Sequence, residues 1–198
     1  MKALLDLVLP FWMERTEIST YRARLEQRRA EHAKGNSLYP EWRKFRELSL
    51  ADLKESLRCD LTRRDVIHRR ALTYLGSVAV LSAFTLGVTR VLSEQSGPAF
   101  AANSLTAALV IVFLGGAAWS ALRIVGPEDV YDLFLPIRVP ADHPLSEAEL
   151  KDEIIFFIHM NQAHNLIFNK YSLRADRCLR NGLISLLLVA IGSLYVNT

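Results

Sequence analysis

Two long stretches without a charged residue constrain the fold of this chain more than any other feature. Ala71–Thr89 contains 19 residues and Ala99–Leu122 contains 24, with no Asp, Glu, Lys or Arg in either. A bilayer core about 30 Å thick is crossed by roughly 20 helical residues. Because lipid offers no hydrogen-bond partner to the backbone, each stretch should be a helix. The connection Arg90–Pro98 is short, so the pattern predicts a transmembrane hairpin.

A third apolar stretch, Gly182–Val196, has 15 residues, which is short for a full crossing. Thinning of the bilayer or burial in an oligomer accommodates such a span, and a re-entrant or interfacial helix is the alternative. We favour a third span with the C-terminus outside. The predicted fold class is an all-α membrane protein with a transmembrane hairpin, a C-terminal span and a cytoplasmic helical layer. Its expected segments are 1–70 (cytoplasmic amphipathic helices), 71–125 (hairpin), 126–181 (cytoplasmic linker and long helix) and 182–198 (third transmembrane or re-entrant helix).

The placement of positive charge predicts the orientation, because cytoplasmic flanks of membrane helices carry an excess of Lys and Arg. The hairpin connection contains only Arg90, which Glu94 offsets. The flanks of the first and third apolar stretches are far more basic: they contain Arg58, Arg63, Arg64, Arg69, Arg70, Lys170, Arg174, Arg177 and Arg180. The N-terminus is therefore expected in the cytoplasm and the hairpin connection outside.

Local signals predict where the helices of the cytoplasmic layer begin and end. Alternating charges over Glu14–Gly35 indicate an exposed helix. Pro40 starts a short helix, Glu41–Leu48. Ser49 is a helix N-cap, and from there no Gly or Pro interrupts the chain before Ala71. A single helix of about 40 residues is expected to run into the first span.

A second long helix is predicted in the C-terminal third. Ser146 and Glu149 form a capping box, and no Pro or Gly follows until Gly182. The N-terminal Met1–Met13 combines Leu, Val, Phe and Trp with Asp6 and Pro10, and is interpreted as an amphipathic segment that packs on the protein or lies on the membrane.

Asn161, Asn165 and Asn169 recur every four residues on this helix, among apolar residues on nearly all sides. Such a helix is buried, so the asparagines are expected inside a bundle. Hydrogen bonds between helices that fix their register are one explanation. A polar seam that lines a ligand pocket or pore vestibule is a second, and a solvated face is a third.

Further candidate residues lie at both ends of the hairpin. Asn103, Ser104 and Thr106, near the outer end of the second stretch, either bond a neighbouring helix or line a pore. Gly76, Ala79 and Ala83 would let helices approach closely. The basic flanks set topology or bind an anionic ligand or acidic lipid. For a ligand, the candidates are Arg63, Arg64, Lys170, Arg174 and Arg177.

No enzyme motif is present. The chain lacks a phosphate-binding glycine loop, a G-x-S-x-G sequence and an H-E-x-x-H sequence. His159 and His164 are five residues apart and point in different directions on a helix. Cys59 and Cys178 are expected as reduced cytoplasmic thiols. Neither catalytic residues nor a metal site nor a cofactor is predicted.

The arrangement resembles the SLATT-like membrane effectors of bacterial anti-phage systems, including Hailong. The resemblance rests on the charged lead with Trp12 and Tyr21-Arg22-Ala23-Arg24-Leu25, the basic stretch from Arg63-Arg64-Asp65 to Arg69-Arg70, the hairpin, and the series Asn161, Asn165, Asn169-Lys170, Leu173-Arg174 and Arg180 before an apolar tail. It covers most of the chain and is architectural. The third apolar stretch departs from the plainest two-span members.

The resemblance implies an effector in the bacterial inner membrane that forms a ligand-gated channel or pore. Its implied partners are the lipid bilayer, further copies of the same chain (a tetramer is favoured) and a nucleotide or oligonucleotide second messenger made by a partner nucleotidyltransferase. Two other functions stay open. One is a membrane scaffold or accessory subunit without conduction, and the other is a small transporter, which the lack of an internal repeat disfavours.

Overall fold

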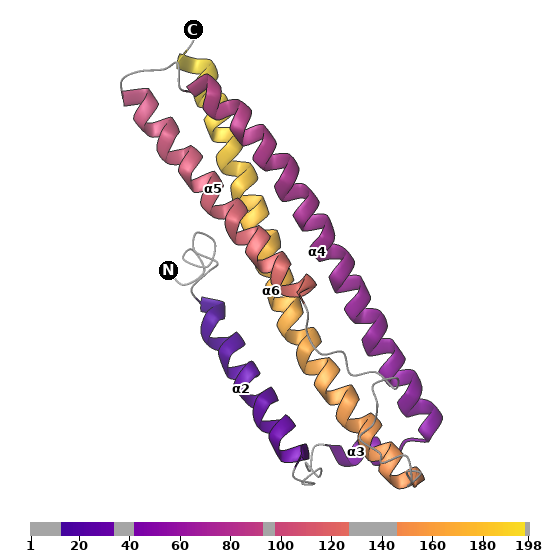
Figure 1. Cartoon of the computed structure of the whole chain (residues 1–198). Coiled ribbons are helices and arrows are strands. Elements are labelled where there is room, and N and C mark those ends of the chain that lie inside the picture. Colours follow the sequence, from indigo (N-terminus) through magenta and orange to yellow (C-terminus); the bar gives the residue numbers. More distant parts are fainter. Residues whose placement is uncertain (1–12, 34–41, 93–97, 127–145, 197–198) are drawn as a thin grey trace. The chain divides into compact units, whose positions relative to one another are not determined.

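The computed structural model describes residues 13–33, 42–92, 98–126 and 146–196. The described chain forms helices and no strands, which confirms the all-α class. The helices are α2 (Met13–Ala33), α3 (Arg43–Arg46), α4 (Leu50–Leu92), α5 (Pro98–Val125) and α6 (Glu147–Val196) (Figure 1). The expected amphipathic segment before Met13 lies outside the described residues.

The two longest helices begin at the predicted caps. The Ser49 hydroxyl accepts the Asp52 N–H at 3.1 Å, and the Asp52 carboxylate accepts the Ser49 N–H at 3.3 Å. Ser146 and Glu149 make the same reciprocal pair, at 3.3 and 2.8 Å. Each pair satisfies N–H groups that a helix start leaves without an acceptor. With no Pro inside them, α4 continues for 43 residues and α6 for 50, or roughly 65 and 75 Å.

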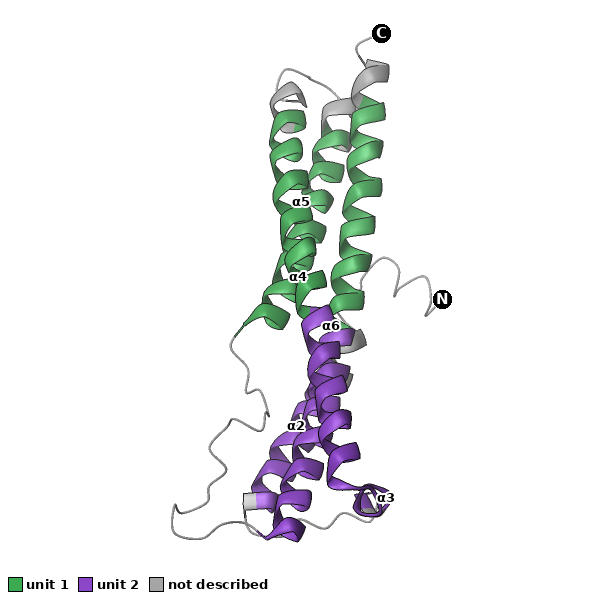
Figure 2. Cartoon of the chain, turned by 90° about the vertical axis from the view of Figure 1, so that its right-hand side faces the viewer, with its two compact units in different colours: residues 1–15, 68–126, 170–198 green, residues 16–67, 127–169 purple. Residues whose placement is uncertain are grey.

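The chain divides into two compact units, drawn in green and purple in Figure 2. Unit 1 consists of Met1–Arg15, His68–Gly126 and Lys170–Thr198, and unit 2 consists of Thr16–Ile67 and Pro127–Asn169. Both α4 and α6 therefore contribute residues to each unit.

The core of unit 2 forms around the first half of α6. Every residue from Ile154 to Ile158 is buried, so this helix is covered on all sides, as its apolar sequence predicts. Ile18 and Leu25 of α2 and Leu53 and Leu57 of α4 are among the other large buried side chains of this unit.

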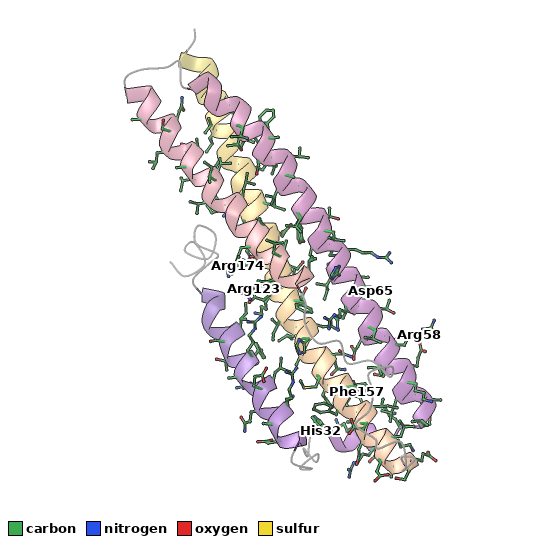
Figure 3. The ribbon with its side chains drawn as sticks, viewed as in Figure 1. His32, Arg58, Asp65, Arg123, Phe157 and Arg174 are labelled. Carbon is green, nitrogen blue, oxygen red and sulfur yellow. The ribbon has the colours of Figure 1, made fainter. Side chains whose placement is uncertain are left out.

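Polar and aromatic contacts fix the ends of α2 and α3 to the start of α6 in unit 2. His32 is 3.1 Å from Glu153 and stacks on Phe156 with ring centroids 3.7 Å apart. Arg46 donates to both carboxylate oxygens of Asp152 at 3.0 Å. In Figure 3, His32 and Phe157 lie at this end of α2 and α6, while Arg58 and Asp65 project from α4 away from its neighbours.

Unit 1 packs α4, α5 and the second half of α6 around Val110, Leu114 and Leu186. Helices α5 and α6 approach closely at Gly192, where an added Cβ would lie 2.9 Å from the Asn103 amide oxygen. Gly182 similarly faces Phe113 and Leu114. By contrast, Gly76, from the predicted set of small residues, has nothing within 4 Å of such a Cβ. Close packing within the chain therefore uses glycines of α6.

Two of the described helices are long and apolar enough to cross a membrane: α4 within Leu50–Val88 and α5 within Asn103–Val125. In their most apolar segments, only 11% of the α4 residues and 44% of the α5 residues are buried. The core helix of a soluble protein would have most of these residues covered. Length and composition are thus consistent with a membrane protein.

Candidate functional site

The five basic residues predicted to bind a ligand are divided between the two units, so they form no single cluster within either. Arg63 and Arg64 belong to unit 2, and Lys170, Arg174 and Arg177 to unit 1. Arg63 is exposed, whereas the Arg64 guanidinium lies 5.1 Å above the centroid of the Phe168 ring. This cation–π contact gives Arg64 a packing role between α4 and α6.

The asparagine series is only partly buried. Asn161 and Asn165 are buried, as expected, but Asn169 is exposed, so the prediction that all three lie inside a bundle is wrong for this residue. The reason is geometric. Each four-residue step advances about 400° around a helix, so two steps rotate the side chain by roughly 80°. The third asparagine has therefore left the buried face.

Asn165 joins α6 to α4 in unit 2. Its amide Nδ2 donates a 2.9 Å hydrogen bond to the backbone carbonyl oxygen of Asp60. A helical carbonyl already accepts one backbone N–H, so this bond uses its second lone pair and fixes the register of the two helices. Of the three explanations for the asparagines, the inter-helix hydrogen bond is the one this contact supports.

Asp60 is a buried carboxyl group beside this contact, on the part of α4 that precedes the apolar segment beginning at Ala71. Burial raises the pKa of Asp60, while a hydrogen bond from Gln162 and the charge of Arg63 act in the opposite direction. Its Oδ2 atom and the Asn165 Oδ1 atom have no hydrogen-bond partner within the described chain. Two buried acceptors without donors make this a costly polar pair in unit 2.

The predicted pore residues belong to α5 in unit 1. Asn103 is buried, with its amide oxygen against Gly192, and Ser104 and Thr106 are half-buried. Within a single chain, Asn103 therefore serves helix packing. Its role in a pore stays a prediction.

A small basic cavity in unit 2 was missed at the level of sequence. It has a volume of about 250 Å³ and is lined by residues of α2 and α6: Tyr21, Arg24, Leu25, Arg28, His159, Gln162, Ala163 and Leu166. The signal was available in the four-residue spacing of Arg24 and Arg28, which places them on one face of α2. That spacing was interpreted as a solvated surface, because sequence alone does not show which face of α2 meets α6.

His159 gives this cavity an uncharged imidazole at neutral pH. Burial and the neighbouring charge of Arg28 lower the pKa of His159 to about 4. Its ring stacks on Trp42 with centroids 4.7 Å apart, and Phe45 meets it edge-on at 4.9 Å. The His159 Nε2 atom is buried and has no hydrogen-bond partner among the described residues. In the part of the chain that the structure describes, no group of three His, Cys, Asp or Glu residues can hold a metal ion.

Comparison with family models, characterised proteins and solved structures finds no match to this chain. The resemblance to SLATT-like effectors therefore remains an expectation that rests on the residues quoted for it.

Proposed function

We propose that this protein is an oligomeric effector of the bacterial inner membrane that forms a ligand-gated channel or pore in anti-phage defence, similar to the SLATT-like proteins. Its ligand would be a nucleotide signal that a partner nucleotidyltransferase makes. The observation that carries the membrane part of this proposal is the outer surface of unit 1. Large apolar side chains are exposed there on all three helices, including Val80 and Leu86 of α4, Ile111 and Trp119 of α5, and Leu187 and Leu188 of α6.

An exposed apolar surface of this extent requires an apolar environment. Soluble monomers rarely expose contiguous apolar patches larger than a few hundred Å². Lipid, or further copies packed within lipid, supplies that environment for unit 1. The exposed apolar residues of α6 support a third span that follows the hairpin, with unit 2 as the cytoplasmic layer.

The end of α5 has the composition of a membrane interface. The Arg123 guanidinium lies 4.6 Å above the Trp119 ring, in the last turns of the helix. Tryptophan and basic residues gather where a span meets the headgroups. This pair supports a cytoplasmic boundary of the second span near Arg123.

Conduction requires several copies of the chain. Val110, Leu114 and Leu186 fill the centre of unit 1 among its described helices, so we place the path between copies of the chain. Closed cyclic symmetry is the usual solution for soluble homo-oligomers, and we favour a tetramer. A pore on the shared axis would be lined by residues that are not buried within one chain, such as Ser104 and Thr106.

The test is ion flux from liposomes that contain the purified full-length protein. We expect flux that depends on a nucleotide ligand, and a symmetric oligomer in detergent. Flux that is absent with every mono-, di- and oligonucleotide tested would overturn the channel and support the non-conducting scaffold.

The orientation has a separate test in the native cysteines. Cys59 is exposed on α4 and Cys178 is buried. A membrane-impermeant maleimide should label Cys59 in inverted vesicles and not in intact spheroplasts, and Cys59→Ser should abolish the label. Adding Thr198→Cys to the Cys59→Ser chain tests the third span, which predicts labelling of the C-terminus in spheroplasts. Labelling of Cys59 from outside contradicts the proposed orientation.

A further inference from the structure

The cavity between α2 and α6 brings two positive charges together beside an apolar wall. Arg24 and Arg28 are one helical turn apart and both line it. The other lining residues contribute no acidic side chain to the cavity. Glu26 pairs with Arg29, at 3.7 Å, and neither of these residues lines the cavity.

The remaining lining residues divide into two kinds. Gln162 adds an amide, and Tyr21 adds a phenol on an aromatic ring. Leu25, Ala163 and Leu166 form an apolar wall. A ligand that matches this lining has a compact anion at one end and a flat or aliphatic group at the other.

We infer that this cavity binds a small organic phosphate, with the phosphate held by Arg24 and Arg28 and a ring-sized group against Leu25, Ala163 and Leu166. Guanidinium groups present several N–H donors that match the oxygens of a phosphate, and this pairing is stronger than that between neutral groups. The volume of about 250 Å³ lies just below the roughly 300–1,000 Å³ of drug-sized ligand sites. It therefore admits one phosphate with one ring, and any larger ligand extends beyond it.

Trp42 reports on this cavity, since its ring stacks on His159, which is one of the lining residues. The chain has three tryptophans, at positions 12, 42 and 119. The variant Trp12→Phe/Trp119→Phe leaves Trp42 as the single fluorophore in the full-length protein. Phenyl phosphate is the probe, and benzoate and inorganic phosphate are the comparison ligands.

We expect a saturable change in Trp42 fluorescence with phenyl phosphate, and weaker binding of both comparison ligands. Removing a hydrogen bond to a charged group costs about 1.5–3 kcal/mol. Arg24→Gln and Arg28→Gln should therefore each weaken phenyl phosphate about ten- to a hundredfold. Arg29→Gln is the matched control on the same helix and should change affinity less than threefold, roughly the effect of a surface charge. Ala163→Leu fills the cavity without altering charge and should also abolish binding.

Each unfavourable result has a definite meaning. Equal weakening by Arg29→Gln and Arg24→Gln would show attraction to the general charge of α2 and overturn the site. Benzoate binding as tightly as phenyl phosphate would overturn the phosphate assignment. Circular dichroism of every variant establishes that it folds. If Arg24→Gln does not fold, phenyl phosphate affinity is measured with Arg24→Lys, which keeps the charge but loses the forked donors.

The site itself stands apart from the proposed channel, and only its role in gating rests on that proposal. Phenyl phosphate binding without any effect on liposome flux leaves the site intact and removes it from gating. Nucleotide-dependent flux in a chain whose cavity binds no phenyl phosphate overturns the site and preserves the channel.

Discussion

Helices α4 and α6 contribute to both units, and their residues show opposite burial patterns in the two. In unit 2, α6 buries Ile154 and Ile158 completely, and the charged side chains of Arg58 and Asp65 project from α4 (Figure 3). In unit 1, Leu86 is 72% exposed and Leu188 is 58% exposed. Several polar residues of unit 1, by contrast, are buried: Thr85, Asn103, Ser120 and Ser185.

This contrast is the one that the proposed membrane location predicts, with water around unit 2 and lipid around unit 1. Water favours the arrangement of unit 2, in which apolar side chains are covered. In lipid, the apolar surface gains nothing from burial against protein, and association of helices relies on close packing and hydrogen bonds. Two buried hydroxyls of unit 1 are satisfied within their own helices: Ser120 donates to the Gly116 carbonyl at 2.8 Å, and Thr85 to that of Leu81 at 2.7 Å.

The largest expected effect comes from the core of unit 2. Ile158 is fully buried, so Ile158→Ala removes packed atoms and leaves a cavity at a cost of about 2–5 kcal/mol. Val66→Ala, at an exposed position of the same unit, should change stability by less than about 0.5 kcal/mol. Thermal unfolding of the purified protein, followed by circular dichroism, compares the two. Equal losses of stability in the two variants would contradict a packed apolar core in unit 2.

The next effect tests the solvent of unit 1. Ile111, at the middle of α5, is 60% exposed, so in water Ile111→Asp would be almost neutral. In a bilayer, a central Asp costs about 2.5–3.5 kcal/mol of insertion. We expect less protein in the membrane fraction and a lower unfolding temperature. The matched control, Val66→Asp, adds the same charge beside Arg63, Arg69 and Arg70 and should be tolerated. Equal tolerance at both positions would place unit 1 in water.

The helices were predictable from sequence because their signals are local. Ser49 with Asp52 and Ser146 with Glu149 are three residues apart, and the missing helix breakers can be read directly. The buried side of α6 also followed from its composition. These features depend on neighbours within a few residues, so no tertiary information was required to predict α4 and α6.

Contacts between distant helices were not predictable in the same way. The sequence marks Gly76 and Gly192 equally as small residues, but only Gly192 meets another helix within the chain, because that depends on how α5 packs against α6. The basic cavity likewise depends on the face of α2 with Arg24 and Arg28 lying beside α6. Asn169 shows the opposite kind of failure. It fits the four-residue spacing of Asn161 and Asn165, which predicted burial, yet it is exposed.

A smaller effect on stability is expected from alanine substitutions at Gly192, which meets another helix, and at Gly76, which does not. A methyl group at Gly192 would lie 2.9 Å from the Asn103 amide oxygen, so Gly192→Ala overpacks the interface by about 1–3 kcal/mol. Gly76→Ala has open space and gains up to about 1 kcal/mol of helix propensity. Adding Asn103→Ala to Gly192→Ala should recover part of the loss, as a double-mutant cycle in detergent would measure. Strict additivity would show that the two residues do not meet.

The smallest expected effect is the pH dependence of stability that His159 of unit 2 contributes. Its pKa falls from the usual 6.5 to about 4, because of burial first and the Arg28 charge second, while the Trp42 and Phe45 rings that face it are uncharged. Between these two values the unfolded chain holds a proton that the folded chain does not, so stability declines as pH is lowered from about 6.5 to about 4. His159→Phe keeps an aromatic ring between Trp42 and Phe45 but cannot titrate. The unfolding temperature of His159→Phe should therefore fall less than that of the wild type between pH 7 and pH 5. All other titratable groups are the same in the two proteins and contribute equally to both curves. Parallel curves would mean that His159 is reached by water, and that the α2–α6 contact is looser than the stacked rings indicate.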